Sequence, residues 1–238
     1  MTIPDWYLGH LPGPCPYLKD RDWRLMLVDG SMLGPSYRRL LDEGFRRHGR
    51  HLYRPDCPGC NACKVHRVPL ETFSMSRGQR RCWRKGQAVF EVAVAEPACT
   101  EEKVAMYNAY LEHQHDNTEE PVDAARYHDF FVATCLPGAT REVQLRVRDT
   151  GALAAVGVVD VFDDALSTVY CYFDPEWSRY SPGTFSALAE IEWARAQGLR
   201  YYYMGFYVAG CPAMAYKARF GPCELRTPGD NGWQRTPE

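Results

Sequence analysis

The sequence predicts a mixed α/β protein of the α+β type, on the strength of strand-like and helix-like segments that alternate along its 238 residues. A helical pattern from Gly183 to Gln197 ends at Gly198 and leads directly into a strand at residues 199–208. Asp163-Asp164 supplies a hairpin turn between two strand-like runs just before that helix. The three strand-like runs of this half lie at residues 142–148, 153–162 and 167–173.

Antiparallel strands, then a helix, then a strand is the element order of the GNAT-like acyltransferase fold. We therefore expect a GNAT-like domain at residues 96–238 and a smaller, cysteine-containing domain at residues 1–95. The border is placed at a proline-containing segment, residues 96–100, because Thr100 can cap a helix over 101–113. A second helix is expected over 124–135.

The first domain is predicted to contain fewer regular elements. Pro35 can begin a helix that runs to about Arg47, with Gly49 beyond its end. The other expected features are a strand at Trp23–Asp29, a cysteine loop at Cys57–Cys63, a strand at Lys64–Leu70 and a polar basic segment at Ser76–Lys85.

Composition indicates a folded globular chain, since 45% of the residues are hydrophobic and 24% are charged. The first residues contain no basic leader, and no apolar run reaches the ~18 residues that span a bilayer. We therefore expect a cytoplasmic protein without a membrane partner. In that compartment the ten cysteines do not indicate a disulfide framework.

The net charge of −2 hides a strongly basic block. Residues 35–85 hold 13 Lys and Arg against 4 Asp and Glu, which leaves this stretch at +9. Basic blocks of this kind are selected by the phosphate backbone of nucleic acids. A solvated basic face is the alternative interpretation.

Three thiols lie at i, i+3 and i+6 in the loop Cys57-Pro-Gly-Cys60-Asn-Ala-Cys63. This spacing is typical of zinc and iron–sulfur sites, and Cys15 is the best candidate for a fourth ligand. Small buried thiols in a tight turn are the alternative. Further along, a strand period of two places Tyr201, Tyr203 and Tyr207 on one face of the strand at 199–208, with Met204, Phe206 and Val208 on the other.

Several strings resemble the aminoacyl-tRNA-protein transferases of the N-degron pathway. They keep the order of that family and cover about residues 12–226, in both halves of the chain. In the first half they are Gly44-Phe45-Arg46-Arg47, Tyr53-Arg54-Pro55, Cys60-x-x-Cys63 and Ser76-Arg77-x-Gln79-Arg80-Arg81. In the second they are residues 167–175, Gly183-Thr184-Phe185-Ser186, residues 203–207 and Met214-Ala215-Tyr216-Lys217.

The chain departs from the family pattern at two places. The eukaryotic arginyl branch pairs an early Cys-x-x-Cys with a later adjacent cysteine pair as metal ligands, whereas here Cys15 stands alone in Cys15-Pro16-Tyr17-Leu18. Pro182 lies where a leucine is expected. The short length and the Cys-Pro-Tyr-Leu start look more like the bacterial aspartate/glutamate leucyltransferases. The resemblance thus implies transfer of leucine from leucyl-tRNA to acceptor proteins with N-terminal Asp or Glu.

The donor ester is already activated, so the transfer needs alignment, removal of a proton and stabilisation of an oxyanion, and no cofactor. Tyr203, Gly205, Tyr207 and Lys217 are the expected catalytic residues. Arg54, Arg67 or Lys217 can bind the acidic acceptor side chain, and Ser167, Tyr170, Tyr172, Asp174 and Tyr216 are the other expected substrate-binding residues. The expected tRNA-binding residues are Ser76, Arg77, Gln79, Arg80, Arg81 and Lys85.

Three alternatives remain. An arginyl donor requires a carboxylate in its pocket, and residues 167–172 and 203–207 contain none. The nearest carboxylates in the sequence are Asp160 and Asp174. A CoA-dependent acetyltransferase needs a Gly-containing pyrophosphate loop that residues 179–184 do not match. A non-catalytic zinc or RNA-binding module would account for the cysteine loop and the basic block, and it would give no role to the second half of the chain.

Overall fold

The computed structural model describes residues 4–115 and 120–236. The first three residues, which are part of the start for which no basic leader is expected, lie outside the described residues. The chain forms two compact units. Unit 1 consists of residues 1–74, 134–137 and 200–238, and unit 2 of residues 75–133 and 138–199. These units divide the chain differently from the border expected near residue 95, because strands from both ends of the sequence pair within unit 1.

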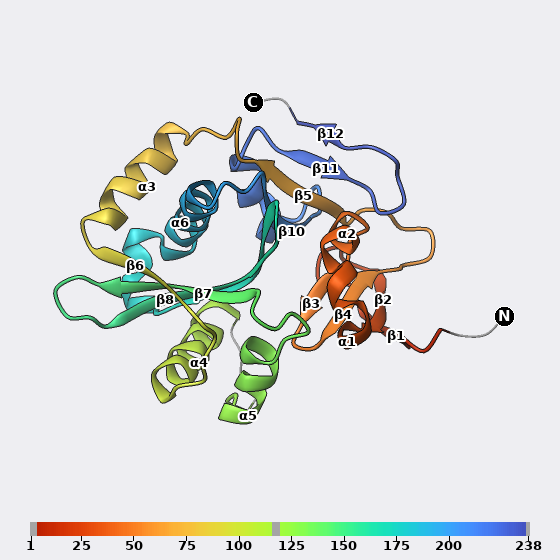
Figure 1. Cartoon of the computed structure of the whole chain (residues 1–238), viewed down its shortest axis with the longest axis horizontal. Coiled ribbons are helices and arrows are strands. Elements are labelled where there is room, and N and C mark those ends of the chain that lie inside the picture. Colours follow the sequence, from red (N-terminus) through yellow and green to blue (C-terminus); the bar gives the residue numbers. More distant parts are fainter. Residues whose placement is uncertain (1–3, 116–119, 237–238) are drawn as a thin grey trace. The chain divides into compact units, whose positions relative to one another are not determined.

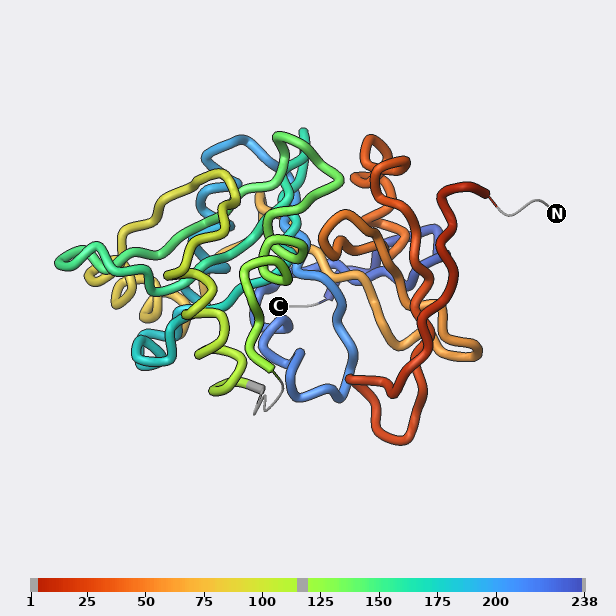
Figure 2. The backbone as a smooth tube through the Cα atoms, turned by 90° about the horizontal axis from the view of Figure 1, so that it is seen from below, coloured from red at the N-terminus to blue at the C-terminus, as the bar shows by residue number. Residues whose placement is uncertain are grey.

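Unit 1 begins with an antiparallel sheet in the order β1-β2-β4-β3. Figure 2 shows the chain of β1 running alongside β2, as their register from Tyr7↔Val28 to Pro14↔Asp22 requires. The predicted strand at Trp23–Asp29 is thus confirmed. The strands are β1 (Tyr7–Pro14), β2 (Asp22–Asp29), β3 (Arg46–His48) and β4 (His51–Pro55).

The helix predicted from Pro35 to Arg47 is wrong in its extent. The chain forms α1 (Gly30–Leu33), η1 (Gly34–Ser36) and α2 (Tyr37–Asp42), and the helix ends before Gly44. Gly44 has a φ of +83°, which favours glycine and turns the chain. Arg46 and Arg47 then pair with Tyr53 and Leu52 in β3.

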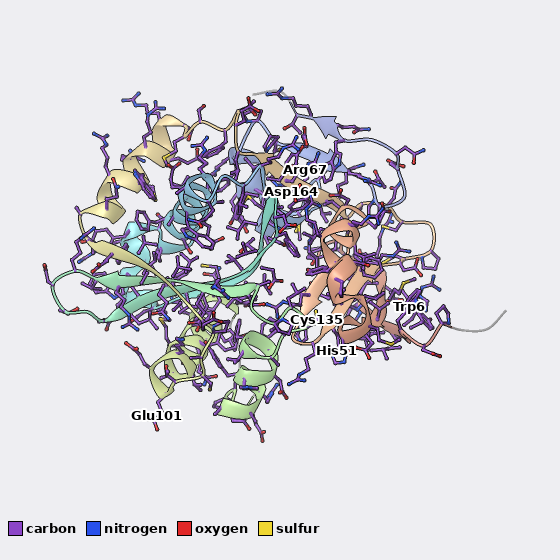
Figure 3. The ribbon with its side chains drawn as sticks, viewed as in Figure 1. Trp6, His51, Arg67, Glu101, Cys135 and Asp164 are labelled. Atoms are coloured by element: carbon purple, nitrogen blue, oxygen red, sulfur yellow. The ribbon has the colours of Figure 1, made fainter. Side chains whose placement is uncertain are left out.

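The remaining strands of unit 1 come from distant parts of the sequence. The order is β12-β11-β5-β10, with β5 (Lys64–Pro69) as predicted and β10 (Tyr201–Tyr207) beside it. Arg67 lies on β5, where Figure 3 labels it. The other elements here are η4 (Pro212–Arg219), β11 (Glu224–Arg226) and β12 (Gln234–Arg235).

Unit 2 is built around an antiparallel sheet in the order β9-β8-β7-β6. The three predicted strand runs and the turn at residues 163–164 are confirmed. Directly opposed residues share a face of a sheet, so Thr140, Asp160 and Ser167 lie on one face, and Gly157 and Cys171 lie on the other. The strands are β6 (Phe90–Ala95), β7 (Thr140–Val147), β8 (Leu153–Val161) and β9 (Ala165–Phe173).

Helices cover both faces of this sheet, with α3 and α6 on one side and α4 and α5 on the other (Figure 1). Gly86 of α3 packs so closely on Phe185 of α6 that a Cβ at residue 86 would lie 2.1 Å from the ring. Ser181, with a φ of 55°, and Pro182 begin α6. The helices are α3 (Arg77–Gln87), α4 (Glu101–His115), α5 (Ala124–Tyr127), η2 (His128–Val132), η3 (Pro175–Tyr180) and α6 (Pro182–Ala196).

Two segments differ from the predicted helices. The helix expected over residues 124–135 is α-helical only to Tyr127 and then widens into the π-helical turn η2. The basic segment at Ser76–Lys85, for which no helix was expected, is helical.

Within the described ranges, no helix combines the length and apolar character needed to cross a bilayer.

Candidate functional site

The most unusual backbone of the candidate site is a bulge at Gly205 in β10. Gly205 has a φ of +81°, and the register with β5 changes from Tyr203↔Arg67 to Phe206↔Val65. The chain therefore advances three residues along β10 while it advances two along β5. This extra residue places Phe206 on the same face as Tyr203, and Tyr207 on the opposite face. The predicted grouping of Tyr201, Tyr203 and Tyr207 on one face is therefore wrong.

Two cationic side chains bind the carbonyl groups of this bulge. Arg46 Nη2 donates to Gly205 O at 3.1 Å, and Lys217 Nζ donates to Phe206 O at 2.6 Å. Both side chains are buried, at 5% and 8% exposed. A Cβ at Gly205 would lie 3.6 Å from Lys217 Nζ and 3.9 Å from Arg46 Nε, so the two nitrogens flank this glycine.

The buried position of Lys217 changes its proton affinity. Burial, reinforced by the charge of Arg46 and opposed by Cys211, lowers the pKa of Lys217 to about 7. His66 is also buried, and burial together with the charge of Lys217 lowers its pKa to about 4. Lys217 can therefore take up and release a proton near neutral pH, which is the property of a general base or acid.

Tyr203 and Arg67 belong to a second hydrogen-bonded group. The Tyr203 hydroxyl donates to Asp42 Oδ1 at 2.5 Å and accepts from Arg67 Nη1 at 3.2 Å. Arg67 Nε donates to Glu224 Oε2 at 2.6 Å, and its guanidinium lies 3.6 Å from the centre of the Trp233 ring. Arg67 thus already has a carboxylate partner and an aromatic neighbour within unit 1.

Arg54, the other candidate for the acceptor side chain, has different surroundings. Its guanidinium lies 5.0 Å above the Phe45 ring. It lines a cavity of about 210 Å³ beside the cysteine loop. Tyr216 is 46% exposed, and the Lys217 ammonium lies 6.0 Å from its ring centre.

The four predicted metal ligands line a second, larger cavity of about 570 Å³. Burial, followed by the neighbouring thiols Cys57, Cys15 and Cys60, raises the pKa of Cys63 to about 12. Cys57 Sγ accepts a hydrogen bond from Arg24 N at 3.2 Å. Among the residues that the structure describes, no three His, Cys, Asp or Glu side chains are grouped so that they could hold a metal ion.

The four thiols thus line the same cavity. Zinc or iron–sulfur binding by Cys15, Cys57, Cys60 and Cys63 stays a proposal. Metal analysis and an absorption spectrum of anaerobically purified protein test it.

The expected substrate-binding residues of β9 lie within unit 2. Ser167 is 1% exposed, and its Oγ has no hydrogen-bond partner among the described residues. The hydroxyls of Tyr172 and Tyr127 lie 2.5 Å apart, and Tyr170 packs its ring against Tyr107 and Phe131. Ser167, Tyr170 and Tyr172 share the face of the sheet that packs against α4 and α5.

Asp174 has a local structural contact. Its carboxylate accepts a hydrogen bond from Glu176 N at 3.0 Å and so caps the start of η3. The structure therefore places the side-chain oxygens of Asp174 at a helix start, where they bind the chain itself.

The predicted tRNA-binding segment forms α3 and separates into two sets of side chains. Ser76 and Gln79 form a capping box, in which each side chain binds the backbone N–H of the other residue. Trp83 stacks on Phe185 at 5.0 Å, toward the core of unit 2. The exposed side chains are Arg77, Arg80, Arg81, Arg84 and Lys85.

Sequence reasoning missed Arg46, His66 and Asp42 as members of the site, and Arg84 as part of the basic face of α3. Arg46 is in a string that resembles the family, so its position carried a signal. His66 and Asp42 carried none, because only the folded chain brings His66 of β5 near Lys217 and Asp42 of α2 to the Tyr203 hydroxyl. Arg84 follows Arg77, Arg80 and Arg81 at helical spacing.

Comparisons with known proteins agree with these observations. Residues 13–81 and 102–227 match the family models described as the N terminus and the C terminus of arginine-tRNA-protein transferase. The aspartate/glutamate leucyltransferase of Saccharophagus degradans is 37% identical over 217 residues, 90% of each chain. That of Halorhodospira halophila is 37% identical over 214 residues, 89% of each chain.

Solved structures resemble this chain in fold. FemX superposes with a TM-score of 0.55 at 9% identity, over 93% of this chain and 86% of its own. The C-terminal domain of a putative lysylphosphatidylglycerol synthetase from Agrobacterium fabrum gives 0.52 at 16% identity, over 69% and 58%. With the order β7, β8, β9, α6 and β10, these likenesses confirm the predicted mixed α/β, GNAT-like fold. Both family models and the relatives show that the chain belongs to the arginine-tRNA-protein transferase family.

Proposed function

We propose that this protein transfers leucine from leucyl-tRNA to the N-terminal Asp or Glu of acceptor proteins and so marks them for degradation. The observation that carries the proposal is the relationship to curated proteins named aspartate/glutamate leucyltransferase, at 37% identity over 90% of both chains. The reaction joins the acceptor nitrogen to the leucyl carbonyl carbon and releases the tRNA hydroxyl.

The bulge at Gly205 supplies suitable chemistry for this reaction. The attacking α-amino group has to lose a proton, and the leaving ribose oxygen has to gain one. With a pKa of about 7, Lys217 can accept the first proton and return it to the leaving oxygen. Tyr203, Tyr207 and the backbone at Gly205 remain the proposed positioning groups.

The face of α3 is the proposed tRNA contact. Arg77, Arg80, Arg81, Arg84 and Lys85 are exposed on one helix, and no carboxylate pairs with them among the described residues. Arginine forks fit phosphate oxygens, so this face can bind the tRNA backbone. Ser76 and Gln79 support that face through the capping box.

The large cavity of unit 1 favours a leucyl over an arginyl donor. Apolar and aromatic side chains provide most of its lining, among them Leu25, Tyr53 and Phe206. Burying a leucyl side chain gains about 1.5 to 3 kcal/mol, whereas an arginyl side chain needs a carboxylate partner. Asp22, the carboxylate at this cavity, is exposed.

An arginyl donor is the second candidate, because the matching family models are described as arginine-tRNA-protein transferase. A competition assay decides between the donors. Leucyl-tRNA and arginyl-tRNA with different isotopic labels are offered together with a peptide that begins with Asp. We expect mainly leucyl transfer, and efficient arginyl transfer would reverse the choice of donor.

A further inference from the structure

Arg54 lies at the edge of a small cavity. Its backbone pairs with Met26 within the sheet, and its guanidinium lies 5.0 Å above the Phe45 ring. The cavity, of about 210 Å³, lies between the loop of residues 55–63 and residues 227–229. All of these residues belong to unit 1.

The charge of Arg54 is uncompensated within the part of the chain that the structure describes. The carboxylate among the lining residues is Asp56, and its Oδ2 already binds Arg24 Nη2 and His10 Nε2, each at 2.8 Å. Within residues 4–115 and 120–236, no carboxylate lies within ion-pair distance of Arg54.

Two other arginines of unit 1 are paired with carboxylates. Arg67 binds Glu224 at 2.6 Å, and Arg226 binds Glu43 at 2.6 Å. A partly buried guanidinium costs desolvation free energy unless a partner restores its hydrogen bonds. At Arg54 that partner has to come from a ligand or from water.

We propose that Arg54 binds the side-chain carboxylate of the acceptor's N-terminal Asp or Glu in this cavity. The inference rests on the proposed function and selects one of the three cations considered for this role. Arg67 is occupied by Glu224 and Asp42, and Lys217 donates to Phe206 O from a buried position. Arg54 presents a planar fork that matches a carboxylate, and this guanidinium lies over the Phe45 ring.

The test compares Arg54→Ala and Arg54→Lys with wild-type protein in leucyl transfer to peptides that begin with Asp or Asn. Loss of a charge-assisted hydrogen bond should lower kcat/KM for the Asp peptide about 10- to 100-fold in Arg54→Ala. Transfer to the Asn peptide should change little, so the preference for Asp over Asn disappears. Arg54→Lys should retain part of the preference.

Arg39→Ala is the matched control, because it removes one exposed positive charge from the same unit. Thermal unfolding of each variant shows whether it folds. A folded Arg54→Ala protein that prefers Asp over Asn as strongly as wild type overturns the inference.

A binding measurement without tRNA separates this inference from the proposed function. Fluorescence anisotropy of a labelled Asp peptide should show binding by wild type, and about 10- to 100-fold weaker binding by Arg54→Ala. Binding that depends on Arg54, in a protein that transfers no leucine, would contradict the proposed function alone. Equal binding by both proteins would contradict the role of Arg54.

Discussion

At the scale of single residues, Lys217 combines two properties that rarely occur together in a structural lysine. It is almost fully buried, and it lies beside Arg46, a second buried cation. The Phe206 carbonyl accepts its hydrogen bond. A buried ammonium without a carboxylate is destabilising, so the fold maintains Lys217 at a cost in free energy.

This cost predicts a pH-dependent effect of Lys217→Met on stability. The pKa of Lys217 is about 7 in the folded protein, and its ordinary value is 10.5. Between pH 7 and pH 10.5 the unfolded chain therefore binds more protons than the folded protein. The contribution of Lys217 to the free energy of unfolding therefore rises with pH through this window and is lost as pH falls through about 7. The groups that face Lys217 include Arg46, His66 and Cys211.

The measurement is thermal or urea unfolding of both proteins at pH 6 and pH 9. Between these values, the Lys217 contribution to wild-type stability should change by about 2 to 3 kcal/mol. The variant should lack this change, so its stability relative to wild type should be higher at pH 6 than at pH 9. Parallel pH dependence of the two proteins would contradict a lowered pKa.

Arg67 gives a second prediction at this scale. Arg67→Met removes the cation from Glu224 and Asp42 in a largely buried pair, and it should destabilise the protein by about 3 to 5 kcal/mol. Arg24→Met is the matched control, since the Arg24 side chain is 41% exposed in its pair with Asp56 and should contribute less than about 1 kcal/mol. Urea unfolding measures both, and equal effects would contradict a structural role for Arg67.

At the scale of elements, α3 shows what sequence patterns can and cannot reveal. Ser76-x-x-Gln79 is a capping-box signature, so the start of this helix could have been predicted. The density of basic side chains in this segment predicts a tRNA contact that includes Ser76 and Gln79, although the side chains of these two residues bind the helix backbone.

The basic face of α3 predicts a salt-dependent loss of tRNA affinity. Replacing Arg80, Arg81 and Arg84 with Ala should weaken tRNA binding, and each lost phosphate contact should reduce the slope of log K against log salt by about 0.7 to 0.9. The matched control removes three exposed charges of unit 1: Lys19, Arg39 and Arg50. Filter binding at several salt concentrations measures both, and an unchanged slope in the α3 variant would place the contact elsewhere.

The bulge in β10 illustrates the opposite case. A strand period of two predicts the faces of Tyr201 and Tyr203 correctly, and it fails beyond Gly205 because one extra residue reverses the alternation. A glycine in a strand indicates that a bulge is feasible. Only the partner strand β5 determines that the register shifts there.

At the scale of the whole molecule, the sequence predicted the fold class and the order of strands and helices in the second half. It did not predict that unit 1 joins both ends of the chain. Arg46 and Gly205 are 159 residues apart in sequence, yet Arg46 donates to Gly205 O. Contacts at such separation depend on strand pairing, which local patterns do not encode.

The most direct test of the central claim is leucine transfer by the purified full chain. The protein is incubated with leucyl-tRNA and a peptide that begins with Asp, and mass spectrometry follows the peptide. Parallel samples contain free leucine without tRNA, or acetyl-CoA in place of leucyl-tRNA. We predict addition of one leucyl residue to the peptide N-terminus with leucyl-tRNA alone. Acetylation of the peptide, or no leucine addition under any condition, would contradict the account.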